Sequence, residues 1–198
     1  PETAVFMEFW STDVATQYMS GSFSPVVASG ISYESRGIMA DVTGTNLFRF
    51  YFPDYKIIEI MPENRHGIEL SFFNGNGIHG RHDNPESVEV ISKLHPIWHD
   101  NIDCITSDDV EALIETGDPN VYLNRFGGRN KQLYMVWNSS KKELKGFALS
   151  VVVPKGWRAI DLYNNKDKQL KVQGPIESSK VLIDLPARSL SVFSVQLR

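Results

Sequence analysis

The sequence predicts an α/β region over residues 1–105, followed by an antiparallel β-sandwich over residues 106–198. Three observations lead to this fold class. An apolar run, Ile68–Phe73, passes through Asn-Gly pairs and a polar loop into a helical pattern. Two further apolar runs precede it, and short strands separated by turn signals follow it. Strands alternating with helices are typical of α/β folds, whereas closely spaced short strands are typical of sandwiches.

The first expected strand, Ala4–Trp10, places Glu8 near its carboxyl end. Enzymes of the α/β class keep catalytic groups at that end of a strand, so Glu8 is a candidate catalytic residue. A structural pairing with a neighbouring Arg fits Glu8 equally well. Asp13 follows the strand, where it is either the N-cap of a helix over Val14–Met19 or a second catalytic carboxylate.

The second expected strand, Lys56–Met61, contains Glu59 between isoleucines. An unpaired carboxylate is costly to bury there, so Glu59 predicts either a structural salt bridge or a ligand contact. Gly21–Gly44, between these two strands, is rich in Gly and Ser and has no clear periodicity.

The third expected strand is Ile68–Phe73, which the Asn-Gly pairs end sharply because both residue types tolerate positive φ. The loop after it contains candidate substrate-binding residues, namely Asn74, Asn76, His79 and Arg81. The asparagines fit two roles, making the turn or binding a sugar through their amides.

A covering helix is expected next, with Asn84 as N-cap and Pro85 as its first residue. Its apolar face is predicted from residues at helical spacing: Val88, Ile91, Leu94 or His95, Trp98 and Ile102.

His95 and His99 have the spacing of a metal-binding pair on this helix. We predict no metal site, because Pro96 disturbs the turn between them and no third ligand is placed nearby. The interpretation is instead that this face of the helix packs against a sheet.

The second region contains seven short apolar runs with turn signals between them, and Ser189–Leu197 alternates clearly between polar and apolar residues. The runs are 121–126, 132–138, 146–153, 159–163, 169–172, 181–185 and 190–197. A supporting sandwich is the simpler interpretation. The alternative is a carbohydrate-binding face formed by Trp137, Tyr134 or Trp157.

Composition narrows the function classes. With 198 residues and 41% hydrophobic content the chain can bury a core, and its net charge of -4 disfavours nucleic acid as a partner. No apolar run is long enough to span a membrane. The single cysteine excludes an intrachain disulfide and a thiolate zinc cluster. We expect a periplasmic or extracellular location, no cofactor, and a cut chain end at Pro1.

The order of these elements resembles the C-terminal part of bacterial glycoside hydrolases, in which a (β/α)8 barrel is followed by an antiparallel β-sandwich, as in the α-galactosidase and α-glucosidase clans. The resemblance depends on Phe6–Phe9, on Phe72–Gly77 and on the closing strand near Leu190–Phe193. It implies that the three strands are the sixth, seventh and eighth of a barrel. It also implies that Glu8 occupies a strand end where such families keep a catalytic carboxylate.

The resemblance therefore implies a glycoside-hydrolase fragment with a carbohydrate substrate. The barrel would be completed by the remainder of the same polypeptide or by another chain, because three strands cannot close it. Two alternatives stay open: a non-catalytic carbohydrate-binding or cell-surface interaction module, and a polysaccharide lyase or other sugar-active enzyme with a similar tail.

Overall fold

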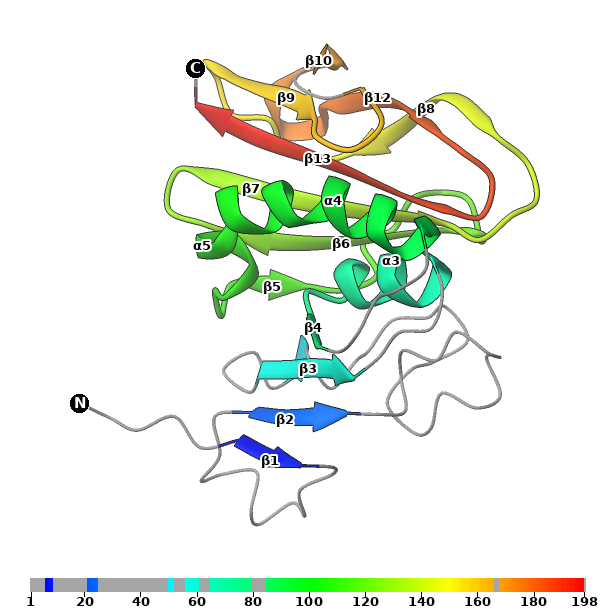
Figure 1. Cartoon of the computed structure of the whole chain (residues 1–198). Coiled ribbons are helices and arrows are strands. Elements are labelled where there is room, and N and C mark those ends of the chain that lie inside the picture. Colours follow the sequence, from blue (N-terminus) through cyan, green and yellow to red (C-terminus); the bar gives the residue numbers. More distant parts are fainter. Residues whose placement is uncertain are drawn as a thin grey trace. The chain divides into compact units, whose positions relative to one another are not determined.

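The computed structural model describes residues 6–8, 21–24, 50–51, 56–60, 65–79, 85–165 and 168–197 (Figure 1). The chain forms two compact units, Pro1–Leu94 and His95–Arg198. The domain boundary at residue 105 stays a prediction. Within the described ranges, no helix has both the length and the apolar character needed to cross a membrane.

The first unit contains a parallel sheet of four strands in sequential order. These strands are β1 (Phe6–Glu8), β2 (Gly21–Ser24), β3 (Lys56–Ile60) and β4 (Gly77–His79). The strands predicted around Glu8 and at Lys56–Met61 are confirmed. β2 was not expected, because Gly-Ser-Phe-Ser contains a single apolar residue and shows no strand pattern. A parallel sheet requires crossover connections, which fits the predicted α/β class.

The segment predicted as the third strand is a helix, and the prediction for Ile68–Phe73 is wrong. Helix α3 spans Arg65–Phe73, and the actual strand, β4, follows it. Every residue from Gly67 to Phe73 is buried, so the segment lacks the exposed polar face that makes a helix recognisable. Arg65 donates to the buried Glu69 one turn later, and the Ser71 hydroxyl donates to the Gly67 carbonyl.

Helix α4 (Pro85–Asp100) begins at the residue predicted for it and continues through Pro96. Of its predicted apolar face, Leu94 is buried and Ile91 and Trp98 are half-buried, but the prediction is wrong at Val88 and Ile102. Val88 is 49% exposed, and the buried positions are instead Ser87, Val90, Leu94 and Ile97. Both sets have helical spacing, so the buried face could not be chosen from periodicity alone.

The second unit is built from two antiparallel sheets, as predicted. One has six strands in the order β10-β9-β13-β7-β6-β5, and the other has three in the order β11-β12-β8. The six-stranded sheet consists of β5 (Val110–Glu111), β6 (Val121–Gly127), β7 (Lys131–Asn138), β9 (Trp157–Asp161), β10 (Lys168–Gln169) and β13 (Ser189–Leu197). The three-stranded sheet consists of β8 (Leu144–Ser150), β11 (Lys171–Gln173) and β12 (Lys180–Leu185), with a short 3-10 helix, η3 (Ile176–Ser178), before β12.

The core of the sandwich lies between these two sheets. Leu123, Val136 and Phe193 of the larger sheet share one buried cluster with Leu149 and Ile183 of the smaller sheet. The Tyr134 and Phe193 rings stack in this core, with their centroids 4.9 Å apart. Alternate residues of β6, β7 and β13 therefore face the smaller sheet, as the sandwich prediction requires.

The larger sheet is buried on its second face as well. Phe126, Leu133, Met135 and Trp137 alternate with the core residues, and each is fully buried. The short helix α5 (Ile102–Ile105) contacts β6 and β7 in this unit. Burial on both faces explains why Leu133–Trp137 reads as a continuous apolar run and not as an alternating one.

Asn138, the last residue of β7, connects two loops, the β7–β8 loop and the β12–β13 loop. Its amide nitrogen donates to the carbonyl oxygens of Lys142, Leu185 and Pro186, at 2.9, 3.2 and 2.9 Å. Its amide oxygen accepts from both the backbone N–H and the hydroxyl of Ser140. The Asn138 side chain is fully buried, so these contacts replace the hydration that its amide and the loop carbonyls would otherwise have.

Candidate functional site

The carboxyl ends of β1 to β4 lie at one edge of the parallel sheet. Glu8 is the last residue of β1, and His79 is the last residue of β4. Glu8 is in register with Phe23, which is followed across the sheet by Ile58 and Gly77. Three strand spacings of about 4.8 Å therefore separate the Glu8 row of β1 from β4, or about 14 Å. The topology brings these two predicted site residues to the same edge.

Glu59 occupies a different register position from Glu8. It pairs with Ser24 of β2 and Ile78 of β4, one row beyond the row of Glu8. Successive positions of a strand belong to opposite faces of a sheet. Glu59 and Glu8 therefore occupy neighbouring rows of the sheet and not the same one.

Asn74 and Asn76 lie at the opposite end of β4 from His79. They occupy the turn between α3 and β4, at the amino end of the strand, and their exposed fractions are 1% and 0%. Asn74 donates its amide to the carbonyl of Leu70. We expected both residues to follow a strand over Ile68–Phe73, but this segment belongs to helix α3. Their expected position at the carboxyl end of a strand, at the rim of the site, is therefore wrong.

The remaining predicted site residues, Asp13 and Arg81, lie outside the described residues. The segment Val14–Met19, for which Asp13 was the expected N-cap, lies outside them as well.

Two of the three aromatic residues that the sequence suggested as an alternative sugar-binding face are buried in the sandwich. Trp137 is fully buried, and Tyr134 is 2% exposed within the core. Trp157 is partly buried and packs against the same core. Aromatic rings bind sugars by stacking on them, which requires an accessible ring face, and neither Trp137 nor Tyr134 has one.

His95 and His99 are both exposed on α4, so the expectation that their face packs against a sheet is wrong. The His99 Nδ1 atom lies 3.1 Å from a carboxylate oxygen of Asp100. Over the described residues, no group of three or more His, Cys, Asp or Glu side chains could hold a metal ion.

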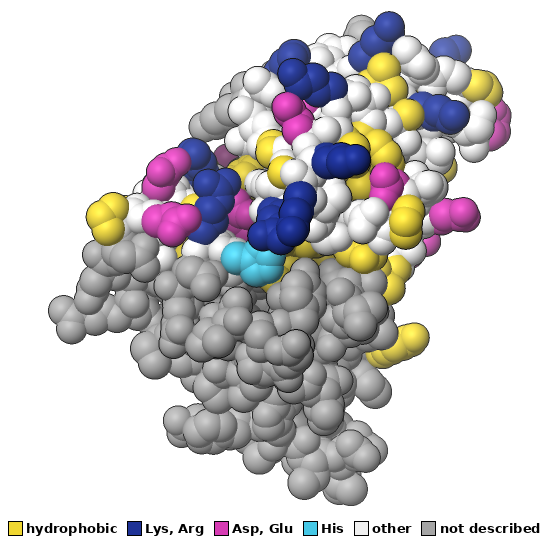
Figure 2. Space-filling view, turned by 90° about the vertical axis from the view of Figure 1, so that its right-hand side faces the viewer, with side chains coloured by type: hydrophobic (Ala, Val, Ile, Leu, Met, Phe, Trp, Pro, Cys, Tyr) yellow, Lys and Arg dark blue, Asp and Glu magenta, His cyan; other side chains and the backbone are white. Residues whose placement is uncertain are grey.

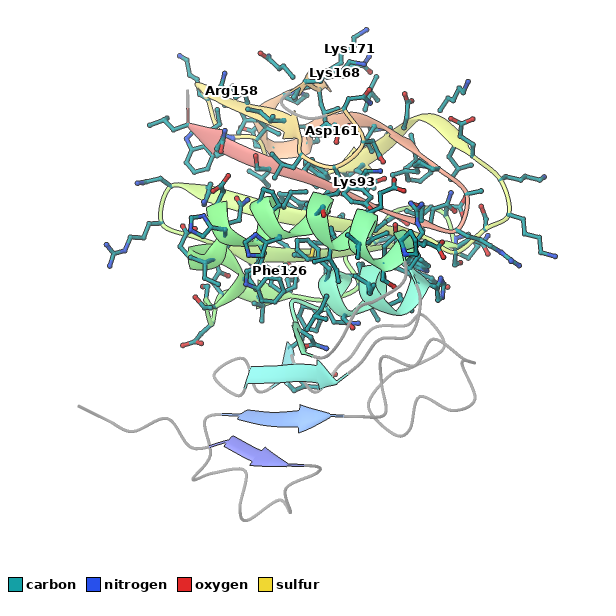
Figure 3. The ribbon with its side chains drawn as sticks, in the orientation of Figure 1. Lys93, Phe126, Arg158, Asp161, Lys168 and Lys171 are labelled. Carbon is teal, nitrogen blue, oxygen red and sulfur yellow. The ribbon has the colours of Figure 1, made fainter. Side chains whose placement is uncertain are left out.

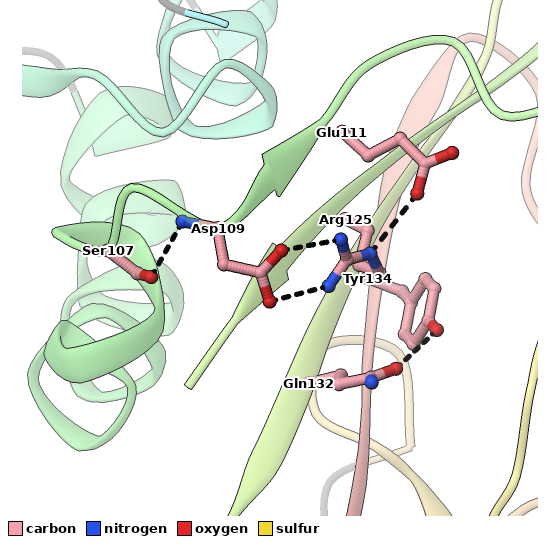
Figure 4. Close-up of polar contacts among 6 residues, drawn as sticks. All are labelled: Ser107, Asp109, Glu111, Arg125, Gln132 and Tyr134. Atoms are coloured by element: carbon pink, nitrogen blue, oxygen red, sulfur yellow. Dashed lines mark hydrogen bonds and ion pairs between the residues drawn. The ribbon is translucent and has the colours of Figure 1, made fainter. Parts of the chain in front are cut away.

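A charged network that the sequence did not predict lies at one end of the sandwich (Figure 4). The Arg125 guanidinium donates to both carboxylate oxygens of Asp109, at 3.0 and 2.7 Å, and its Nε donates to Glu111 at 3.3 Å. The hydrogen bond from Arg125 is the largest cause that lowers the pKa of Asp109. Burial raises the pKa of the nearby Tyr134 to about 12, so its hydroxyl stays protonated and donates to Gln132. The signal available in the sequence was the lone Arg within the apolar run Val121–Phe126.

The Asp109–Arg125 pair predicts a pH-dependent contribution to stability. The pKa of Asp109 is lower in the folded state than in the unfolded chain, where it is about 3.9. The pair therefore stabilises the fold above about pH 4, and this contribution is lost as the pH falls through the lowered pKa. Arg125→Met should be destabilised at neutral pH, with a difference from the wild type that shrinks below about pH 4. Urea unfolding of both proteins from about pH 2.5 to about pH 7, a range that includes the normal Asp pKa, measures this difference in stability.

Lys145→Met is the matched control for that measurement, because Lys145 and Glu143 form a longer and exposed pair at 3.8 Å. Its difference from the wild type should stay small throughout. A constant difference between Arg125→Met and the wild type over the whole pH range would contradict the role of the ionised Asp109.

The buried Cys104 packs closely against the backbone at Gly128. A Cβ atom added to Gly128 would lie 2.7 Å from the Cys104 Sγ, so the close approach of α5 to the β6–β7 turn needs glycine there. Burial, followed by the charge of Asp103, raises the pKa of the thiol to about 12. The thiol is therefore protonated at neutral pH, and it lacks the thiolate character of a catalytic cysteine.

Comparison with known proteins identifies the fold. The sequence matches no protein-family model and no curated protein. The structure matches an α-amylase from Geobacillus thermoleovorans complexed with acarbose, with a TM-score of 0.61 and 13% identity over 98% of this chain and 54% of that chain. An Anoxybacillus α-amylase matches with a TM-score of 0.60 and 11% identity over 98% of this chain and 52% of that chain.

A noncanonic maltogenic α-amylase from Thermotoga neapolitana matches with a TM-score of 0.58 and 12% identity, over 100% of this chain and 55% of that chain. The chain thus spans about half the length of the solved structures that it matches. The resemblance in fold to glycoside hydrolases, which the sequence predicted, is confirmed.

Proposed function

We propose that residues 1–105 are the closing part of a catalytic (β/α)8 barrel in a glycoside hydrolase that acts on oligo- or polysaccharides. The observation that supports this most is a parallel sheet in sequential strand order, running through α4 into an antiparallel sandwich. With β2 included, the chain supplies the fifth to eighth strands of the barrel, one more than the sequence predicted. The remaining strands come from the rest of the polypeptide or from another chain, because four parallel strands leave open edges.

In this proposal Glu8 is a catalytic carboxylate. Hydrolysis of a glycoside needs one carboxyl group to protonate the leaving oxygen and another to act as nucleophile or base. Glu8 ends the first strand at the carboxyl edge of the sheet, where barrel enzymes place their catalytic groups. We assign it as the general acid. Asp13, five residues further along, is the second catalytic candidate, and His79 and Arg81 are the candidate sugar contacts.

The test is Glu8→Gln in the full-length protein that contains this chain. Glutamine keeps the size and much of the hydrogen bonding of glutamate but has no proton to transfer. Turnover of natural glycosides should fall by at least about 10²-fold, the low end of general acid–base catalysis. Aryl glycosides with good leaving groups should be less affected in the glycosylation step, because their departure needs little protonation. Initial rates on both substrate types, together with thermal unfolding, measure this.

Glu59→Gln is the matched control, because the register places Glu59 on a different row from Glu8. Its turnover should stay within a few-fold of the wild type. Near-normal turnover of Glu8→Gln on a natural glycoside would remove Glu8 from the mechanism. Absence of any glycosidase activity in the wild-type protein would refute the proposed function itself.

A further inference from the structure

The charges of this chain are separated along the sequence. Residues 119–198 contain fourteen Lys and Arg but only five Asp and Glu, whereas residues 1–118 contain six Lys and Arg and nineteen Asp and Glu. The net charge of -4 conceals this division. The strands from β6 to β13 are therefore strongly basic, and the chain before them is strongly acidic.

Only a few of the basic side chains of the sandwich are neutralised by ion pairs. Arg125 pairs with Asp109 and Glu111, Lys131 with Asp103, and Lys145 weakly with Glu143. Nine others have no ion pair within the described part of the chain: Arg129, Lys141, Lys142, Lys155, Arg158, Lys168, Lys171, Lys180 and Arg188. In the face that Figure 2 shows, Lys and Arg side chains are spread over the upper part of the molecule.

Three of these cations form a group that we call the lysine patch: Lys168, Lys171 and Lys180. Lys171 is in register with Leu182, so Lys180 on β12 is its diagonal neighbour, about 7–8 Å away between Cα atoms. Both alternate with core-facing residues such as Val181 and therefore lie on the outer face of the smaller sheet. Lys168 on β10 precedes Lys171 by three residues, a span of at most about 10 Å. All three residues are exposed, and Figure 3 shows Lys168 and Lys171 extending away from the ribbon.

The residue paired with Lys168 across β9 and β10 is an aspartate, but its carboxylate does not neutralise the lysine patch at the surface. Asp161 is opposite Lys168 but is 2% exposed. Its side chain accepts the backbone N–H groups of Tyr163 and Asn164, both at 3.0 Å, and so it holds the turn after β9. The three exposed lysines of the patch, one on the larger sheet and two on the smaller, therefore present positive charge to solvent.

We propose that the lysine patch binds an acidic polysaccharide, one that bears uronate carboxylates or sulfate groups. This inference rests on the proposed function, because it names the class of polysaccharide to which the proposed glycoside hydrolase binds. Carboxylates repeating along a glycan can contact several lysines of the patch at once, which raises the avidity above that of a single pair.

Two other polymer classes fit the surface less well. A neutral glycan would be held mainly by stacking on aromatic rings, and Trp137 and Tyr134 are buried. Single-stranded nucleic acid also requires aromatic stacking platforms, and the burial of Trp137 and Tyr134 leaves neither ring available for this role.

The experiment is affinity electrophoresis of the 198-residue chain through gels containing polygalacturonate, with neutral dextran as the reference polymer. We expect retardation by polygalacturonate only, and a binding constant that falls as salt is added. In the variant Lys168→Gln/Lys171→Gln/Lys180→Gln, binding should weaken by about tenfold, as expected for the loss of three exposed ion pairs. Binding does not require hydrolysis, so this result is independent of the test of Glu8.

The matched control is Arg129→Gln/Lys141→Gln/Lys142→Gln, which removes the same charge from the turns flanking β7. It should keep at least half of the wild-type affinity, and thermal unfolding should show that both variants are folded. If both variants lost affinity for polygalacturonate equally, binding would depend on the total charge and not on the lysine patch, and the proposal would be wrong. Equal retardation by dextran, or tighter binding to single-stranded DNA than to polygalacturonate, would overturn the proposal.

Discussion

Asn138→Ala should lower the free energy of unfolding of the sandwich by about 3–5 kcal/mol. The substitution removes five hydrogen bonds, which leaves the carbonyls of Lys142, Leu185 and Pro186 without their side-chain donor. Each buried polar group left unsatisfied costs about 1–3 kcal/mol, and relaxation of the loops recovers part of the sum. Urea unfolding followed by tryptophan fluorescence measures the change.

Two further variants test whether the donor bonds of Asn138 are responsible. Asn138→Asp keeps the oxygen that accepts from Ser140 but turns the donor atom towards the three carbonyls into an acceptor, so it should be as unstable as the alanine variant. Ser139→Ala removes one exposed bond to the Asn120 carbonyl and should cost about 1 kcal/mol or less. If Asn138→Ala were no less stable than Ser139→Ala, the two loops would not depend on Asn138.

Trp137→Ala should be the other strongly destabilised variant, by about 3–5 kcal/mol. Trp137 is among the largest fully buried side chains and lies between Tyr122 of β6 and Leu190 of β13. Its removal leaves a cavity on the second face of the larger sheet, which rigid neighbouring strands cannot close. Guanidinium unfolding should show the midpoint moving to lower denaturant with an unchanged slope.

Trp157→Ala is the control for Trp137, because Trp157 is partly buried at the last register position of β9 with β13. It removes the same side chain but less buried surface, and its cost should be clearly smaller. A sugar-binding role for Trp137 predicts the reverse pattern, namely lost glycan binding in a protein of normal stability.

The sandwich strands were predictable because their signals are local. Alternation in Ser189–Leu197 and turn residues such as Phe126-Gly127-Gly128 determine where strands lie without knowledge of the rest of the fold. The start of α4 was predictable for the same reason, since Asn84 and Pro85 have fixed preferences at a helix N-terminus.

The segment Ile68–Phe73 could not be assigned from such local signals. An apolar run of six residues fits a buried strand and a buried helix equally well, and the surroundings of α3 decide between them. Spacing did hold one indication of a helix, because Arg65 and Glu69 lie one turn apart and pair in the structure. Assigning the strand too early in the sequence moved Asn74 and Asn76 to the wrong end of it.

Net charge was also a poor guide to this surface. The sum over the chain disfavoured nucleic acid as a partner, but it averages an acidic first part with a basic sandwich. The Debye length in physiological salt is about 8 Å, so a partner senses the charge of the local patch more than the net charge of the chain.

The position of β13 has a consequence for how the protein is made. This strand, Ser189–Leu197, lies between β9 and β7, in the interior of the larger sheet. Both neighbours come earlier in the chain, so during translation they wait with open edges until the last residues of β13 leave the ribosome. The sandwich core then closes through contacts between residues far apart in sequence, which form slowly. Until β13 has left the ribosome and paired with them, the open edges of β7 and β9 make the nascent sandwich prone to aggregation and a target for chaperones.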